Sequence, residues 1–130
     1  MATLNLRAAG PAPVGTVWGR YTDFQRWPGW SPQIRAVHTD TAYIAPGVHG
    51  HVESVLGVTV AFVVEDVDHD RRSWIWRVRS GPVRVRLRHD VRPRRTGAGT
   101  ETRLVMQGPL LVLVAYAPLA RLALRRLVRI

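Results

Sequence analysis

The segment Trp18-Gly-Arg-Tyr-Thr-Asp-Phe-Gln-Arg-Trp-Pro-Gly-Trp-Ser-Pro32 holds three of the five tryptophans of the chain and two further aromatic residues. Residues 13–22 and 24–27 are predicted to form two short helical turns, with Asp23 as the N-cap of the second. Pro28 is expected to end that turn, so that Trp30 lies in a loop broken by Pro and Gly. A helical pair placed after a first strand is typical of folds that enclose a ligand cavity.

The rest of the chain reads as strands followed by one helix. Alternation of apolar and polar residues, β-branched residues at 58–67 and a turn at Pro46-Gly47 together predict seven strands. They lie at 3–8, 34–39, 48–56, 58–67, 73–79, 83–91 and across 102–106. An apolar helix is expected after Pro109, kinked or restarted at Pro118. Its uninterrupted apolar part is shorter than the roughly 20 residues that a membrane-spanning helix needs, which indicates a core helix.

Length and composition restrict the possible protein classes. The chain has 130 residues with 46% hydrophobic and 22% charged residues, as in a globular protein, and we expect one domain over residues 1–130. Without cysteine, the chain can form neither disulfides nor a thiolate metal site. The first residues lack the charged leader and apolar core of a signal peptide, which predicts a cytoplasmic protein. No cofactor is expected.

The charge is strongly positive, with 19 basic residues, all arginine, against 9 acidic ones and a net charge of +10. Strand alternation places five arginines on one outward face: Arg77, Arg79, Arg84, Arg86 and Arg88. Like charges on paired strands are destabilising, so a carboxylate from Glu53, Glu65 or Glu101 is expected to offset them. The alternative is an external anion, namely a phospholipid membrane surface, an acyl-carrier protein or a nucleic acid. Nucleic acid is disfavoured because no exposed aromatic residues alternate with these arginines.

The order and spacing of several motifs resemble the START-like (SRPBCC) superfamily, in its bacterial polyketide cyclase/dehydrase-like branch. The motifs are Ala12-Pro13-x-x-x-Val17-Trp18, Thr22-Asp23-Phe24-x-x-Trp27-Pro28-x-Trp30, Pro46-Gly47, Trp74 and Trp76 followed by Gly81, His89, and Gly99-Thr100. The resemblance implies an α+β helix-grip fold, in which a curved antiparallel sheet of about six to seven strands wraps around a long C-terminal helix. It also implies an apolar cavity for a lipid, sterol or polyketide. The last helix stops at Ile130, shorter than expected, so a second subunit or a membrane is a candidate for closing the cavity.

The predicted lining of this cavity is aromatic and aliphatic. Tyr43 and Tyr116 would supply hydroxyl groups to a flat or aliphatic ligand. The alternative is that the aromatic side chains only fill the core, which we favour for Trp18 and Tyr21. The candidate ligand-binding residues are Trp30, Tyr43, Phe62, Trp74, Trp76, Val85, Leu87, Leu104, Met106 and Tyr116.

His89 is the candidate catalytic residue, because strand parity points it inward between Leu87 and Val91. An imidazole there could act as a general acid or base, as a cyclase or dehydrase requires. A structural role is favoured, with its nitrogens satisfied by neighbouring strands or by Tyr116, because no inward carboxylate would orient the ring. His49 and His51 share one strand face, but two ligands do not make a metal site, and no metal is expected.

Three functions follow as hypotheses. The favoured one is binding of a hydrophobic small molecule between the sheet and the C-terminal helix, with His89 orienting it. The second is a polyketide cyclase or dehydrase that uses His89 for proton transfer. The third is an interaction module that uses the outward arginines, with a homodimer as one possible assembly.

Overall fold

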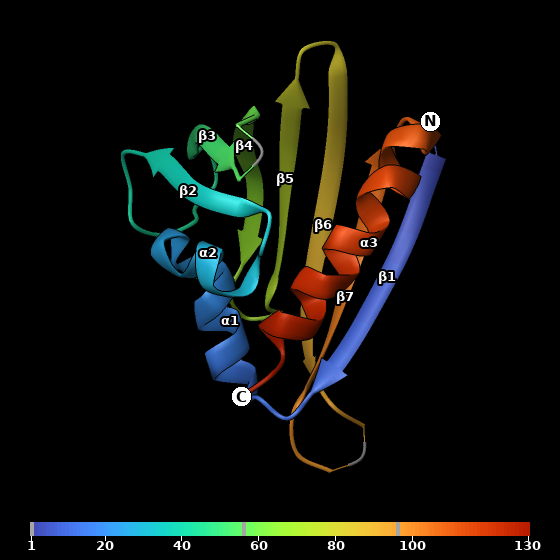
Figure 1. Cartoon of the computed structure of the whole chain (residues 1–130). Coiled ribbons are helices and arrows are strands. Elements are labelled where there is room, and N and C mark those ends of the chain that lie inside the picture. The colour runs from blue at the N-terminus through green and yellow to red at the C-terminus, as the bar shows by residue number, and fades with distance from the viewer. Residues whose placement is uncertain (1, 56, 96) are drawn as a thin grey trace.

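The computed structural model describes residues 2–55, 57–95 and 97–130, and its centre is a seven-stranded antiparallel sheet (Figure 1). The strands are β1 Ala2–Gly10, β2 Ile34–Thr39, β3 His49–Ser54, β4 Thr59–Asp68, β5 Ser73–Ser80, β6 Val83–Pro93 and β7 Thr100–Gly108. Strands β2 to β7 follow one another as a meander, and β1 pairs with β7 to give the order β1-β7-β6-β5-β4-β3-β2. The predicted helix-grip sheet is therefore confirmed.

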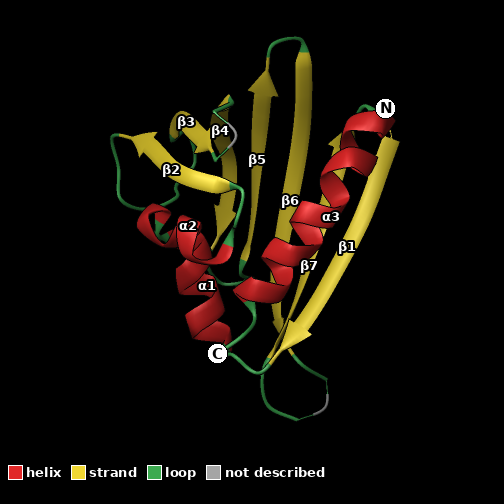
Figure 2. Cartoon of the chain, in the orientation of Figure 1, coloured by secondary structure: helices red, strands yellow, loops and turns green. Residues whose placement is uncertain are grey.

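The helices all lie against one face of the sheet (Figure 2). They are α1 Val14–Thr22, the 3-10 helix η1 Phe24–Arg26, α2 Trp27–Trp30 and the long C-terminal helix α3 Leu110–Leu127. Helix α3 runs along β1 and β7, and α1 and α2 lie below β2 in the same view (Figure 1). The inner face of the sheet is thus covered by α3 on one side and by the short helices on the other.

Pro28 behaves differently from the prediction, and the last helix does not restart at Pro118. Pro28 lies in the first turn of α2, where its missing N–H has no intrahelical partner to lose, so the chain stays helical and Trp30 is in a helix instead of a loop. Helix α3 continues through Pro118 as one element of 18 residues. The predicted N-cap is confirmed, because the Asp23 carboxylate accepts a hydrogen bond from the Gln25 amide at 3.0 Å.

The strand predictions are confirmed with small changes in their ends. The third strand covers His49–Ser54 instead of 48–56, and Leu56 lies outside the described residues. An irregularity between Val64 and Asp66 shifts the register of β4 against β5. Such a bulge increases the local bend of a strand, which helps the sheet curve around α3.

The short helices are tied to the end of α3. The Arg20 guanidinium donates hydrogen bonds to the carbonyl oxygens of Leu127 and Arg129, each at 2.6 Å. Carbonyls at a helix C-terminus lack intrahelical donors, and a basic side chain satisfies them. Within the described residues, no helix combines the length and the apolar character needed to cross a membrane.

Candidate functional site

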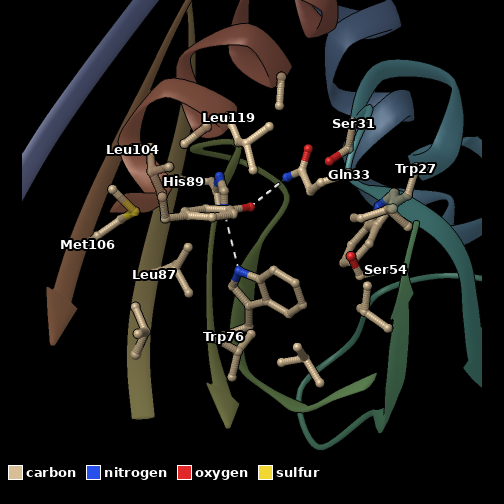
Figure 3. Close-up of a pocket in the computed structure, with 18 of the residues that line it drawn as sticks. Trp27, Ser31, Gln33, Ser54, Trp76, Leu87, His89, Leu104, Met106 and Leu119 are labelled. Atoms are coloured by element: carbon tan, nitrogen blue, oxygen red, sulfur yellow. Dashed lines mark hydrogen bonds between the residues drawn. The ribbon is translucent and has the colours of Figure 1, made fainter. Parts of the chain in front are cut away.

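A cavity of about 320 Å³ lies between the inner face of the sheet and α3 (Figure 3). Strands β3 to β7 form its floor, α3 forms one wall, and α2 with the start of β2 forms the other. Nine residues expected at the site line it: Trp30, Trp74, Trp76, Val85, Leu87, His89, Leu104, Met106 and Tyr116.

Tyr43 and Phe62 do not line this cavity, which corrects their expected placement. Tyr43 is 62% exposed and pairs with Asp23 through an isolated β-bridge, while the next residue, Ile44, turns into the core. Phe62 is buried beneath the wall, with its ring 6.3 Å from that of Trp27 and 5.5 Å from that of Trp76. Its ring packs against two aromatic residues that line the cavity, without lining the cavity itself.

The aromatic wall is built by the segment 18–32. The Trp27 indole donates a hydrogen bond to the Tyr21 carbonyl at 2.8 Å, and the Trp30 indole donates one to the Arg20 carbonyl at 3.0 Å. These bonds hold both rings against the end of α1. Trp27 then contacts Trp76 edge to face, with ring centroids 5.1 Å apart, an arrangement that aromatic rings prefer.

Trp18 and Tyr21, which the sequence assigned to the core, have different environments. Tyr21 is fully buried, as expected. Trp18 is only partly buried, and its indole donates to the Nδ1 atom of His69 at 3.3 Å.

Both ring nitrogens of His89 are engaged by protein groups, and Figure 3 shows the bond to Trp76. The Trp76 indole N–H lies 3.2 Å from Nε2, and because an indole can only donate, Nε2 must accept. The neutral ring then carries its hydrogen on Nδ1 and donates it to the Tyr21 hydroxyl at 3.1 Å. Tyr116, which the sequence suggested as a partner, bonds elsewhere.

The hydrogen-bond chain continues in one direction to the backbone. The Thr102 hydroxyl donates to the Asp90 carbonyl at 3.0 Å, so it accepts from the Tyr21 hydroxyl, which lies 3.2 Å away. Hydrogen bonds therefore run in one direction, from Trp76 to His89, to Tyr21, to Thr102 and finally to the Asp90 carbonyl. The chain therefore fixes the tautomer of His89 without any charged group.

Burial lowers the pKa of His89 to about 3. The ring also stacks on Trp74, with centroids 4.5 Å apart and planes 11° from parallel, and Trp74 is itself buried. At neutral pH the imidazole is uncharged, so it holds no proton to deliver as a general acid. Its one lone pair is occupied by Trp76, which also restricts general-base chemistry.

The polar groups at the cavity are few and neutral. The Gln33 amide nitrogen donates to the Tyr116 hydroxyl at 2.6 Å, which joins α3 to the segment before β2 (Figure 3). The Gln33 Oε1 and Trp74 Nε1 atoms are buried and have no hydrogen-bond partner within the described residues. Burial raises the pKa of Tyr116, which keeps its hydroxyl protonated.

Sequence reasoning missed several lining residues. Trp27 was placed in a helical turn but not at the cavity, and Gln33 carries no pattern that identifies it. The small residues Ala120 and Ala123 of α3 leave the space that the cavity occupies, and their helical spacing was a usable signal. None of the lining residues is Asp, Glu, Lys or Arg.

The arginines lie on the opposite, outer face of the sheet, as predicted. Arg77 faces Arg86 across β5 and β6, and Arg79 faces Arg84. The Glu65 carboxylate contacts both Arg77 and Arg86, which confirms it as an offsetting group. Glu53 instead bonds to His38 at 3.1 Å.

Asp90 supplies a second carboxylate to the outer face; strand alternation places it there, but it was not among the expected offsetting groups. It lies 3.7 Å from Arg88 and 3.5 Å from Arg103. A separate hollow on this face is lined by Arg77, Arg79, Arg84 and Arg86 together with Gln107 and apolar residues of β4, β5 and β6.

The search of solved structures found neighbours with the same fold at low sequence identity. A protein from Nitrosospira multiformis is 13% identical with a TM-score of 0.81, and the match covers 98% of this chain and 94% of that one. The di-domain ARO/CYC protein BexL from the BE-7585A biosynthetic pathway is 15% identical with a TM-score of 0.80, over 98% of this chain and 45% of that one. An uncharacterised Bacillus thuringiensis protein is 16% identical with a TM-score of 0.75, over 95% and 96%.

The search of curated proteins found no match. The family model described as "Polyketide cyclase / dehydrase and lipid transport" matches residues 1–129. The seven-stranded sheet, the two short helices after β1 and the enclosing α3 agree with that match. The chain belongs to the polyketide cyclase/dehydrase and lipid transport family of the START-like superfamily.

Proposed function

We propose that this protein binds an uncharged hydrophobic small molecule in the cavity between the sheet and α3. The observation that carries the proposal is an internal cavity of about 320 Å³ whose lining contains no formally charged side chain. Moving an ionised group into such a site without a partner is strongly unfavourable, so a neutral ligand fits and a carboxylate does not. The volume is at the lower end of the range of roughly 300–1,000 Å³ for small-molecule sites, which favours a compact ring system or a short acyl chain.

The unpaired polar atoms indicate what the ligand carries. The Gln33 Oε1 atom can accept a hydrogen bond, and the Trp74 indole N–H can donate one. A phenol, alcohol or carbonyl on an otherwise apolar ligand would satisfy them. Polyketide-like aromatic molecules have this combination of flat apolar surface and sparse hydroxyl or carbonyl groups.

A catalytic role through His89 has less support. A general acid must hold a proton at working pH, and the pKa of His89 is about 3. Both ring nitrogens have protein partners, so the ligand would have to displace Trp76 before it reached Nε2. We therefore assign His89 the role of holding Trp76 and Tyr21 in place along the cavity wall.

A matched pair of probes tests the proposal. 2-Naphthol and 2-naphthoate have similar size, but only the second is charged at neutral pH. We expect calorimetry to show tighter binding of 2-naphthol, although the net charge of +10 attracts anions. Equal or tighter binding of 2-naphthoate would show that the probes bind at surface arginines.

A variant pair on α3 locates the binding. Ala123 lines the cavity and Ala115 is exposed on the same helix, so Ala123→Phe fills the site while Ala115→Phe adds the same ring outside it. Loss of 2-naphthol binding only in Ala123→Phe supports the cavity as the site. Native mass spectrometry with organic extraction of the purified protein then identifies any natural ligand that remains bound.

A further inference from the structure

One end of the molecule, which we call the hairpin end, consists of residues 54, 55, 57–60, 79–85 and 108–114. The strand register brings these segments together, because Arg79 lies opposite Ala61 on β4 and opposite Arg84 on β6. Gly108 packs against the backbone of Arg84, which places the start of α3 beside the β5–β6 hairpin. Figure 1 shows the hairpin, the β3–β4 connection and the start of α3 at the same end.

The hairpin end exposes large aliphatic side chains. Their exposed fractions are 55% for Val55, 49% for Val58, 59% for Leu110, 83% for Leu111 and 56% for Val114. Single exposed aliphatic residues are ordinary on protein surfaces. Several of them gathered at one end indicate contact with an apolar partner.

The same end carries positive charge without acidic residues of its own. Segments 54–60 and 79–85, and the whole stretch 105–120, contain no Asp or Glu. Arg77 and Arg86 share Glu65, whereas the neighbouring pair Arg79 and Arg84 has no ion pair among the described residues. Two like charges directly opposite each other on paired strands are destabilising, so a negative partner would be favourable here.

The lining of the cavity also extends to this end. Val58, Val83 and Val112 line it, and they belong to the β3–β4 connection, the β5–β6 hairpin and the first turn of α3. Residues on the inner side of the hairpin therefore alternate with the outward Arg79 and Arg84. A partner that covered the hairpin end would lie next to this part of the cavity lining.

We propose that the hairpin end docks on the surface of an anionic phospholipid bilayer. Such a surface offers phosphate groups to Arg79 and Arg84 and an acyl boundary to Leu110 and Leu111, and amphipathic protein surfaces bind membranes in this way. A second copy of the chain would bring its own arginines against them at a net charge of +10 each. A nucleic acid would satisfy the arginines but leave the aliphatic side chains in water. The inference does not depend on what occupies the cavity.

Co-sedimentation with phosphatidylcholine vesicles, with and without phosphatidylglycerol, tests the proposal. We expect binding that requires phosphatidylglycerol and weakens with added salt. The double variant Arg79→Glu/Arg84→Glu should bind at least about tenfold more weakly, because each basic residue near an anionic surface contributes to binding. The control Arg94→Glu/Arg95→Glu makes the same charge change in the β6–β7 connection at the other end of the strands.

A second variant pair tests the apolar contact. Leu110→Ser/Leu111→Ser should weaken vesicle binding severalfold, whereas Ile130→Ser, an equally exposed aliphatic residue away from the hairpin end, should not. Circular dichroism confirms that each variant is folded. Equal losses in the two charge variants would overturn the proposal, because net charge alone would then explain binding. A stable dimer that Leu110→Ser/Leu111→Ser dissociates, without vesicle binding, would overturn it in favour of a second copy.

Discussion

At the scale of single residues, Tyr21 is the centre of the polar structure beneath the cavity. Its buried hydroxyl accepts from His89 and donates to Thr102, and its ring contacts Trp30 and Trp74 edge to face. Burial raises the pKa of Tyr21, so this hydroxyl stays protonated and the direction of the chain is preserved. One tyrosine thereby joins α1 to strands β6 and β7.

Tyr21→Phe is expected to destabilise the protein by about 2 kcal/mol, because it leaves the buried Nδ1–H group of His89 without an acceptor. Tyr43→Phe is the matched control, since Tyr43 is 62% exposed, and it should change stability by less than about 0.5 kcal/mol. Urea unfolding measures both. Equal effects would contradict the hydrogen-bond chain described above.

His89 predicts a pH dependence of stability. In the unfolded chain its pKa is the ordinary 6.5, and in the folded protein it is about 3. Between these values the unfolded state binds more protons, so stability falls by about 1.4 kcal/mol for each pH unit as the pH decreases. The contribution is complete above pH 6.5 and is lost towards pH 3.

Urea midpoints measured at several pH values should show this slope below pH 6.5 and level off above it in the native protein, whereas His89→Phe should lack this contribution. The phenyl ring keeps the stack on Trp74 but cannot titrate, and the other histidines remain in both proteins. His89→Phe should be less stable at neutral pH, since Trp76 then lacks an acceptor. Parallel pH profiles for the two proteins would show that His89 is solvated.

At the scale of elements, the close approach of β1 to the end of α3 depends on Gly10. A Cβ atom at this position would lie 2.8 Å from the side chain of Val128 and even closer to its carbonyl oxygen, so the backbone would have to move. The Ala12 amide donates to that same carbonyl at 3.0 Å. Gly10 therefore permits the close contact between the end of β1 and the C-terminal end of α3.

Gly10→Ala should destabilise the protein by roughly 2–3 kcal/mol, because overpacking against backbone cannot relax by a rotamer change. Gly15→Ala is the control within α1, where a Cβ atom would meet nothing within 4 Å. It should raise stability by about 0.5–1 kcal/mol through helix propensity. Thermal unfolding should therefore move in opposite directions for these two substitutions.

The elements were largely predictable from the sequence, and the exceptions have physical reasons. Period-two alternation located the strands at 3–8, 73–79 and 83–91, which have one face against the helices, and β-branched residues located the strand at 58–67. The helix boundary at Pro28 was wrong because a proline that follows a turn can either end a helix or begin one, and only tertiary contacts of Trp27 and Trp30 decide. Pro118 was ambiguous for a similar reason.

The candidate site was less predictable than the fold. Strand parity correctly placed Leu87, His89 and Met106 inward, because parity is local. The failure at Tyr43 arose because the residue lies in an irregular connection, where no periodicity applies. The partners of His89 come from α1 and β5, and sequence spacing does not show which hydroxyl or indole reaches a ring across the core.

At the scale of the whole molecule, the cavity allows ligand binding but lowers the folding stability of the empty protein. Interiors are normally packed without large voids, so unfilled space between the sheet and α3 forfeits packing energy. Ala123→Phe should therefore stabilise the empty protein by about 0.5–2 kcal/mol while removing ligand binding. Native protein should instead gain about 2.7 kcal/mol in the presence of ligand at 100 times its dissociation constant.

Thermal unfolding with and without 2-naphthol compares these two effects directly. The unfolding temperature of the native protein should rise when ligand is added. That of Ala123→Phe should be higher than the native value without ligand and should not change when ligand is added. A destabilised Ala123→Phe variant that still binds 2-naphthol would show that the ligand lies elsewhere. Ala115→Phe should behave like the native protein in both conditions.

The tryptophans of the cavity wall also have an optical consequence. Trp27, Trp74 and Trp76 lie with ring centroids 5.1, 5.3 and 5.6 Å apart, and these rings together with Trp30 line the cavity. Indoles at such distances share their electronic excitation, which produces a paired signal of opposite sign in circular dichroism. A molecule that enters the cavity changes the orientation or the surroundings of these rings, so the coupled signal reports occupancy without any added dye. Trp18 is hydrogen-bonded to His69 and does not line the cavity, so its own contribution to the signal should not change when a ligand binds.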